Sequence, residues 1–109
     1  MATVNNIVID QGSTFSLTIN LENDDGTAKD LADYSAFSQI RKSYYSTTYT
    51  NFTIVKNDAI GMITISLSAE ETQALKPGRY VYDLEISAAF ETIRVIEGIA
   101  TITPEVSRA

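Results

Sequence analysis

The chain has 109 residues, 44% of them hydrophobic, and a formal net charge of −6 at pH 7, which fits one folded domain with its own core. The eight Lys and Arg residues are scattered, which argues against nucleic acid and against membrane surfaces as partners. There is no Cys and no His, which excludes thiol chemistry, imidazole bases and the usual zinc ligands, and we expect no cofactor.

Alternation of apolar and polar residues predicts β-strands along most of the chain. In the clearest case, residues 14–21, Phe15, Leu17 and Ile19 share one face and polar side chains share the other. This pattern is typical of a sheet with one face on a core and one in water. In chain order, the predicted strands cover residues 4–10, 14–21, 34–42, 51–55, 60–67, 79–86 and 92–103.

The segments between these strands carry signals of their own. Residues 22–30 form a turn whose strongest feature is Asp25-Gly26, and residues 87–91 form a hairpin turn. Residues 43–50 are rich in Tyr, Ser and Thr and predict either a long loop or an edge strand. Within the last strand the alternation falters at Glu97-Gly98, where Gly indicates a bulge or a close approach of another backbone.

One stretch, residues 68–86, predicts a short helix, a sharp turn and a strong strand. Ser68 is a good N-cap, and Glu71 three residues later completes a capping box. Pro77 and Gly78 end the helix, because Pro lacks a backbone N–H and Gly accepts unusual backbone angles. Tyr80 then opens the strand. This stretch is a structural corner and carries no chemistry of its own.

About seven strands, with one short helix before the sixth, predict an all-β fold. We expect an immunoglobulin-like Greek-key β-sandwich that forms a single domain over residues 1–109. Tyr80 fits the tyrosine corner of such folds, in which its hydroxyl bonds the backbone nearby and Tyr82 occupies a core position. A jelly roll or a small barrel is the competing architecture.

The acidic residues offer two candidate sites, each with a simpler explanation. Asp83 and Glu85 share one strand face, as the paired carboxylates of a glycosidase do, but a solvated outer face is the better explanation. Asn23, Asp24, Asp25 and Asp30 could supply oxygen ligands to calcium, although their spacing does not match an EF-hand. A hairpin turn explains them without a metal, and we predict no catalytic and no metal-binding residues.

The most interesting surface candidate is the segment from Arg41 to Tyr49. Cations beside aromatic rings are enriched at protein interfaces. The alternative is a strand end that extends its cations to water and packs one Tyr in the core. The candidate interface residues are Arg41, Lys42, Tyr44, Tyr45 and Tyr49.

A resemblance extends over nearly the whole chain. It is carried by Gln11-Gly12, Asp25-Gly26, Leu31 with Tyr34, residues 39–45, Pro77-Gly78-Arg79-Tyr80, Tyr82-Asp83, Glu97-Gly98 and residues 103–106. With these elements the chain resembles small virion structural proteins of tailed bacteriophages, especially T4-like phages that infect marine cyanobacteria. The resemblance implies a virion location after synthesis in the host cytoplasm, other virion proteins as partners, and multiple copies in a large assembly.

The first hypothesis is therefore a non-enzymatic virion structural protein. It would decorate or cement the capsid, or join head, neck or tail components, through protein–protein contacts. The second is a tail or baseplate adhesion module that binds host surface carbohydrate. The third, a small hydrolase, would need Asp83 or Glu85 in a deep pocket with a raised pKa. We also expect both chain ends to be held by neighbouring subunits.

Overall fold

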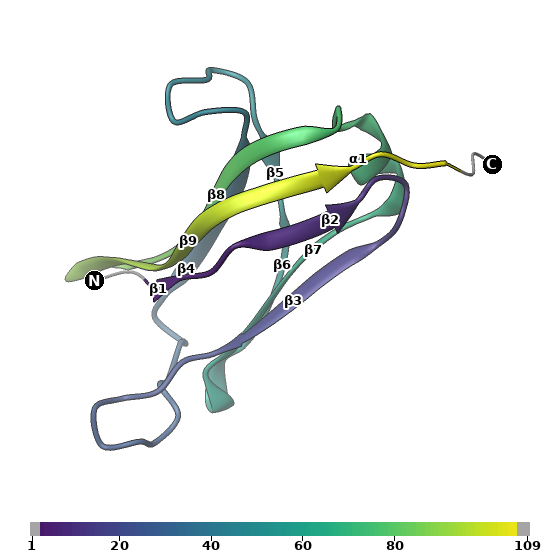
Figure 1. The fold of residues 1–109 in the computed structure, drawn as a ribbon. Helices are drawn as coiled ribbons and strands as arrows, with labels where there is room; N and C mark the ends of the chain where they lie inside the picture. Colours follow the sequence, from purple (N-terminus) through teal and green to yellow (C-terminus); the bar gives the residue numbers. More distant parts are fainter. Residues whose placement is uncertain (1–2, 107–109) are drawn as a thin grey trace.

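A computed structural model describes residues 3–106, which form two β-sheets packed face to face (Figure 1). The larger sheet contains β1 (Thr3–Val4), β2 (Ile7–Asp10), β4 (Ser35–Arg41), β5 (Thr50–Asn51), β8 (Gly78–Ala88) and β9 (Glu91–Thr103). The smaller sheet contains β3 (Phe15–Asn20), β6 (Thr53–Asn57) and β7 (Met62–Leu67). A 3-10 turn, η1 (Asp58–Ile60), precedes β7, and the helix α1 (Ala69–Ala74) follows it.

The order of the strands is that of an immunoglobulin-like sandwich. The larger sheet runs β1-β9-β8-β4-β5, with β2 also on β9, and the smaller runs β3-β7-β6. The predicted all-β sandwich with a helix before the Tyr80 strand is thus confirmed, and the jelly roll is excluded. Residues 3–106 contain nine strands rather than the predicted seven, because two predicted strands are each divided: residues 4–10 into β1 and β2, and residues 51–55 between β5 and β6.

The core forms where the inward faces of the two sheets meet. Ile63 and Ile65 of β7 and Leu84 of β8 have no accessible surface. These positions follow the alternation in the sequence, because successive side chains of a strand point to opposite faces. Burial of such side chains contributes about 1.5–3 kcal/mol each to folding.

The first predicted strand, residues 4–10, is interrupted at Asn5 and Asn6. Both β1 and β2 pair parallel with β9 in one register. Between them the Asn6 side-chain oxygen accepts from the Ile99 N–H at 3.0 Å, and the Tyr82 hydroxyl donates to the Asn5 carbonyl. The Asn5 N–H still donates to the Glu97 carbonyl at 2.8 Å, so these side-chain bonds supplement the backbone pairing here. Gly98 allows the Asn5 backbone to lie against β9, which is the close approach that the sequence indicated.

Residues 51–55 do not form one strand, because the chain changes sheets at Phe52. β5 pairs with β4 in the larger sheet, whereas β6 pairs with β7 in the smaller. Phe52 itself is buried between the sheets, and its N–H donates to the Ser38 carbonyl at 3.0 Å. The next strand also begins later than predicted, at Met62, because Ile60 belongs to η1 and Gly61 takes a positive φ of 65°.

The structural corner has the predicted geometry. The Ser68 side chain accepts from the Glu71 N–H at 3.2 Å, and the Glu71 carboxylate accepts from the Ser68 N–H at 2.9 Å. The helix ends at Ala74, shortly before Pro77 and Gly78. The Tyr80 hydroxyl donates to the Lys76 carbonyl at 2.8 Å, which is the bond of a tyrosine corner.

Candidate functional site

A hollow of about 440 Å³ lies on the outer face of the larger sheet, the face turned away from the core. Strands β4, β8 and β9 form its floor, and the loop after β4 forms one rim. Register places Gln39, Asp83 and Glu97 in one row across the three strands. The lining residues are Phe37, Gln39, Arg41, Tyr44, Val81, Tyr82, Asp83, Glu85, Arg94 and Glu97.

A β-bulge brings two of these residues to the same face. Along a regular strand, residues three apart point to opposite faces. Between β8 and β9 the register shifts at Leu84/Glu85, so one extra residue of β9 is accommodated. Arg94 and Glu97 consequently both face outward, while Val95 packs against the core. This bulge is the physical origin of the faltering alternation near Glu97-Gly98.

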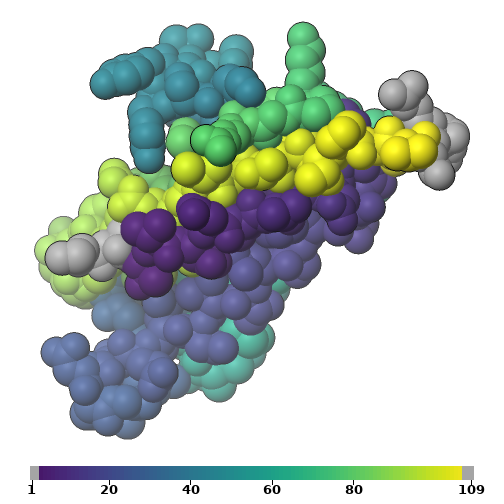
Figure 2. All heavy atoms as spheres, in the orientation of Figure 1, coloured from purple at the N-terminus to yellow at the C-terminus, as the bar shows by residue number. Residues whose placement is uncertain are grey.

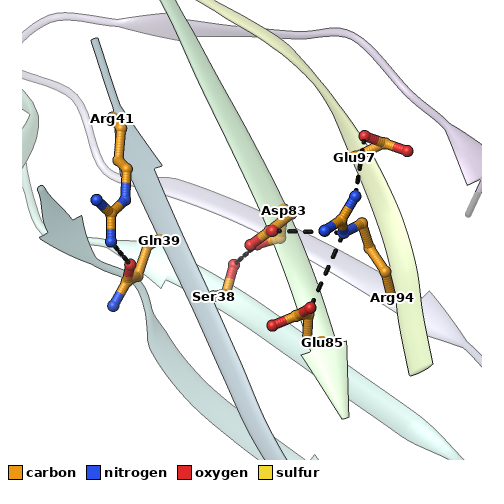
Figure 3. Close-up of polar contacts among 7 residues, drawn as sticks. All are labelled: Ser38, Gln39, Arg41, Asp83, Glu85, Arg94 and Glu97. Atoms are coloured by element: carbon orange, nitrogen blue, oxygen red, sulfur yellow. Dashed lines mark hydrogen bonds and ion pairs between the residues drawn. The ribbon is translucent and has the colours of Figure 1, made fainter. Parts of the chain in front are cut away.

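Arg94 lies among three carboxylates (Figure 3). Its Nε is 3.7 Å from Asp83 and 3.9 Å from Glu85, and its Nη1 is 3.7 Å from Glu97. One cation therefore balances three anions at distances longer than hydrogen bonds. Burial, followed by the charge of Glu85, raises the pKa of Asp83. The hollow accordingly presents oxygen acceptors that are only partly satisfied.

The candidate interface residues divide into anchors and exposed rings. Arg41 is an anchor: its Nη1 donates to the Ser46 carbonyl at 2.6 Å, and its guanidinium lies 4.7 Å from the centroid of the Tyr49 ring. Lys42 lies 4.8 Å from the centroid of the Tyr80 ring. Tyr44 and Tyr45 are 71% and 94% exposed. Tyr49 is 49% exposed, so the alternative in which one Tyr packs in the core is wrong.

We call residues 42–49 the aromatic loop. Of the two readings left open by the sequence, a long loop is the observed one, with only Thr50 and Asn51 pairing at the sheet edge. Figure 2 shows this segment standing out from the sandwich. Tyr44 lines the hollow, so the loop and the hollow form one continuous surface.

Sequence reasoning found only part of this surface. Asp83 and Glu85 lie on an outer face as expected, and they are brought together with Arg94 and Glu97, which were missed. Phe37, 57% exposed at the hollow, was also missed. The signal for Arg94 and Glu97 was the broken alternation itself, because a bulge re-aims the side chains on either side of it.

The acidic turn is held by its own hydrogen bonds. The Asp25 carboxylate accepts from the Thr27 N–H at 3.0 Å and from the Thr27 hydroxyl at 2.6 Å. The side-chain bond from Thr27 is the main cause that lowers the pKa of Asp25. Asp30 accepts from the Ala32 N–H at 3.0 Å. Within residues 3–106, no group of three or more acidic side chains is placed to hold a metal ion.

Two further observations concern partners. Among the described residues, no helix has the length and apolarity needed to cross a bilayer. At the start of the described chain, Thr3 pairs with Ile96 of the same chain, so an intramolecular strand pair holds this end. Met1, Ala2 and residues 107–109 lie outside the described residues. The expectation that neighbouring subunits hold the chain ends stays a prediction.

The substitution Asp83→Asn is expected to stabilise the fold at pH 7. Because the folded state raises the pKa of Asp83, its ionised form disfavours folding above that pKa, and this disadvantage disappears as the pH falls and the folded protein binds the proton. The side chain is 37% exposed, so screening limits the gain to about 0.5 kcal/mol. Thermal unfolding of both proteins between pH 3 and pH 8 measures it.

The control for this prediction is Asp24→Asn. It changes the net charge equally but lies on the exposed turn. An equal gain in both variants, or a gain from Asp83→Asn that persists at pH 3, would contradict the explanation.

Comparisons with known proteins show similarity of fold. No protein-family model and no curated protein matches the chain. Listeria monocytogenes InlP is 18% identical with a TM-score of 0.51, and the match covers 94% of this chain and 28% of InlP. The endo-β-1,4-mannanase from Thermotoga petrophila is 13% identical with a TM-score of 0.57, over 92% of this chain and 18% of the enzyme. This chain therefore spans less than a third of either structure, and the likeness shows the β-sandwich fold alone.

Proposed function

We propose that the chain is a non-enzymatic binding module and acts as a structural protein of a bacteriophage virion. In this role it contacts other virion proteins through the aromatic loop and the adjoining hollow. The resemblance described above suggests that the protein belongs to a virion. The aromatic loop and the hollow suggest that it acts through contacts with other proteins.

The observation that carries the proposal is the display of Tyr44 and Tyr45 on an anchored loop. The Arg41 guanidinium, at the end of β4, donates a hydrogen bond to the Ser46 carbonyl of the loop. The Ser46 hydroxyl accepts from the Ser43 N–H at 3.1 Å and closes the turn. An ordered loop loses less conformational freedom on binding than a mobile one. Two exposed Tyr rings on such a loop are the kind of residue that dominates binding energy at protein interfaces.

The surroundings of the carboxylates are consistent with a non-enzymatic role. A glycosidase uses one carboxylic acid to protonate the leaving group and a second carboxylate as base or nucleophile. Here Asp83, Glu85 and Glu97 all lie around one cation, Arg94, so no two of them stand as a free pair across a space for a glycosidic bond. These carboxylate side chains are also 31–37% exposed, so water is not excluded from them.

Carbohydrate adhesion is the second candidate function, and one observation favours it. Tyr44 and Phe37 line the same hollow as Gln39 and Asp83. Aromatic faces that stack on sugar rings, beside amide and carboxylate groups that bond hydroxyls, are a suitable combination for a saccharide. The same residues serve a protein partner equally well, so the occupant must be tested directly.

The test is the double substitution Tyr44→Ser and Tyr45→Ser. Both rings are exposed, so the fold should be retained, with a melting temperature within about 3 °C of the wild type. Incorporation into particles should fall at least tenfold, measured by quantitative immunoblotting of purified virions. Val55→Ser, which removes an exposed apolar side chain from the smaller sheet, is the matched control and should be incorporated normally.

Location in the particle separates the two functions. Immunogold labelling of intact virions should place the protein on the head, neck or tail tube if it joins structural components. Labelling of the tail tip, with glycan binding that is lost in Tyr44→Ser, would establish adhesion instead. Absence from purified particles would overturn the virion proposal.

A further inference from the structure

Strand β3 is an edge strand of the smaller sheet and lacks the features that usually prevent an edge from pairing with another strand. It pairs with β7 on one side only, through all six of its residues. Its sequence, Phe-Ser-Leu-Thr-Ile-Asn, contains no charged residue and no Pro. Natural proteins usually protect such edges with Lys, Pro, bulges or very short strands. The other edges are protected in this way: β5 has two residues, β6 contains Lys56, and β1–β2 is interrupted at Asn5 and Asn6.

The backbone of β3 has bonding groups directed away from the sheet. The Leu21 N–H donates to the Gly61 carbonyl at 2.8 Å, on the side of β7. Bonding direction alternates along an antiparallel strand. The N–H and C=O groups of Ser16, Thr18 and Asn20 therefore point to the free edge. All three residues are exposed.

The inward face of β3 is incompletely covered. Its neighbour β7 buries Ile63 and Ile65 completely. The inward side chains of β3 contact the same core but remain partly exposed. A further strand on this edge would cover this apolar row and satisfy the free backbone groups at the same time. The partly exposed residues are Phe15, Leu17, Ile19 and, just beyond the strand, Leu21.

We propose that this edge pairs with the same edge of a second copy of the chain. The two β3 strands run antiparallel about a two-fold axis at Thr18, so that Thr18 faces Thr18. Ser16 then lies opposite Asn20, and Leu17 opposite Ile19. Every pair joins like with like, polar with polar on the outer face and apolar with apolar on the inner. A shift by one residue would place the apolar row against the polar face.

The absence of charge on β3 favours a second copy as the occupant. Each chain carries a net charge of −6, so two copies repel except where they meet at a neutral surface. At the axis, Thr18 meets its own copy, and any charge there would face an identical charge. Pairing through β3 joins the two smaller sheets into one continuous sheet. The aromatic loop belongs to the other sheet, so this interface is independent of the proposed function.

The experiment measures the mass of the protein in solution by sedimentation equilibrium over a range of concentrations. The wild type is expected at twice its 12.0 kDa. Thr18→Lys places two ammonium groups opposite one another and should weaken the dimer at least tenfold, an effect that high salt reduces. Thr64→Lys is the matched control, because it removes the same 3.0 Å hydroxyl contact between Thr18 and Thr64 and adds the same charge on β7, away from the edge.

Each outcome is decisive. A wild-type dimer that is lost in Thr18→Lys and kept in Thr64→Lys supports pairing through β3, provided that circular dichroism shows both variants folded. A monomeric wild type overturns the proposal, whether or not a different chain occupies the edge. Dimers that survive in both variants place the contact elsewhere. Dimers lost in both indicate stacking of the outer sheet faces, which also contradicts edge pairing.

Discussion

Thr72→Val is expected to destabilise the fold by about 2–3 kcal/mol, which corresponds to a fall in melting temperature of about 10–20 °C. Thr72 lies on α1 and is completely buried. Its hydroxyl accepts from the Gly12 N–H at 3.0 Å and donates to the Ser13 carbonyl at 2.8 Å. Val has nearly the same shape but leaves both backbone groups without a partner, and this desolvation cost dominates.

Thr72→Ser is the control that separates the hydroxyl from the methyl group. It keeps both hydrogen bonds and creates only a small cavity, so its loss should be less than half of that caused by Val. Thermal unfolding followed by circular dichroism measures both variants. Equal losses for Val and Ser would show that packing, and not the bonds to Gly12 and Ser13, explains the role of Thr72.

Gly98→Ala is expected to cost about 2–3 kcal/mol by displacing the first strands of the chain. A Cβ at this position would collide with the Asn5 carbonyl oxygen and lie 2.8 Å from its carbon. Because the obstacle is backbone, it cannot rotate away as a side chain can. The Tyr82 hydroxyl would also lose the Asn5 carbonyl to which it donates. Hydrogen exchange should show that the backbone amides of β2 lose more protection than the fall in global stability explains.

Gly26→Ala is the matched control for Gly98→Ala. Gly26 has a φ of 88° and open space around its Cβ position, so its substitution measures the cost of backbone conformation alone, about 1 kcal/mol. Protection of β2 should not change in this variant. If β2 keeps its protection in Gly98→Ala as well, the close approach of Asn5 to Gly98 does not hold the first strands in place.

The fold was predictable wherever the signal is local. The alternation in β3 and β7, and the Ser68 and Glu71 pair, depend on neighbours within a few residues along the chain. The change of sheet at Phe52 was not predictable. The alternation pattern shows that a strand residue is buried, but it does not show to which of the two sheets the strand belongs. The parallel pairing of β2 with β9 joins residues 93 positions apart, and alternation carries no information on such partners.

The candidate site was predictable in part for the same reason. The Tyr residues of the aromatic loop are recognisable by type as interface candidates, since Tyr is enriched at protein interfaces, but their exposure depends on the fold. The grouping of Arg94 with Asp83, Glu85 and Glu97 depends on strand order and on a bulge. Thr72 was missed because a Thr in a short helix looks like an ordinary surface residue until the tertiary structure places the Gly12 and Ser13 backbone beside it.

The parallel pairing of β2 with β9 also determines how the molecule would carry mechanical load. Because the two strands run in the same direction, their outer ends, at β1 and after Thr103, lie toward opposite ends of the molecule (Figure 1). Tension applied through these ends would act along the strands, perpendicular to their hydrogen bonds, and would load all of these bonds together. A hairpin pulled at its open end loses its bonds one at a time, so shear at the β2–β9 pair would make this sandwich resist extension.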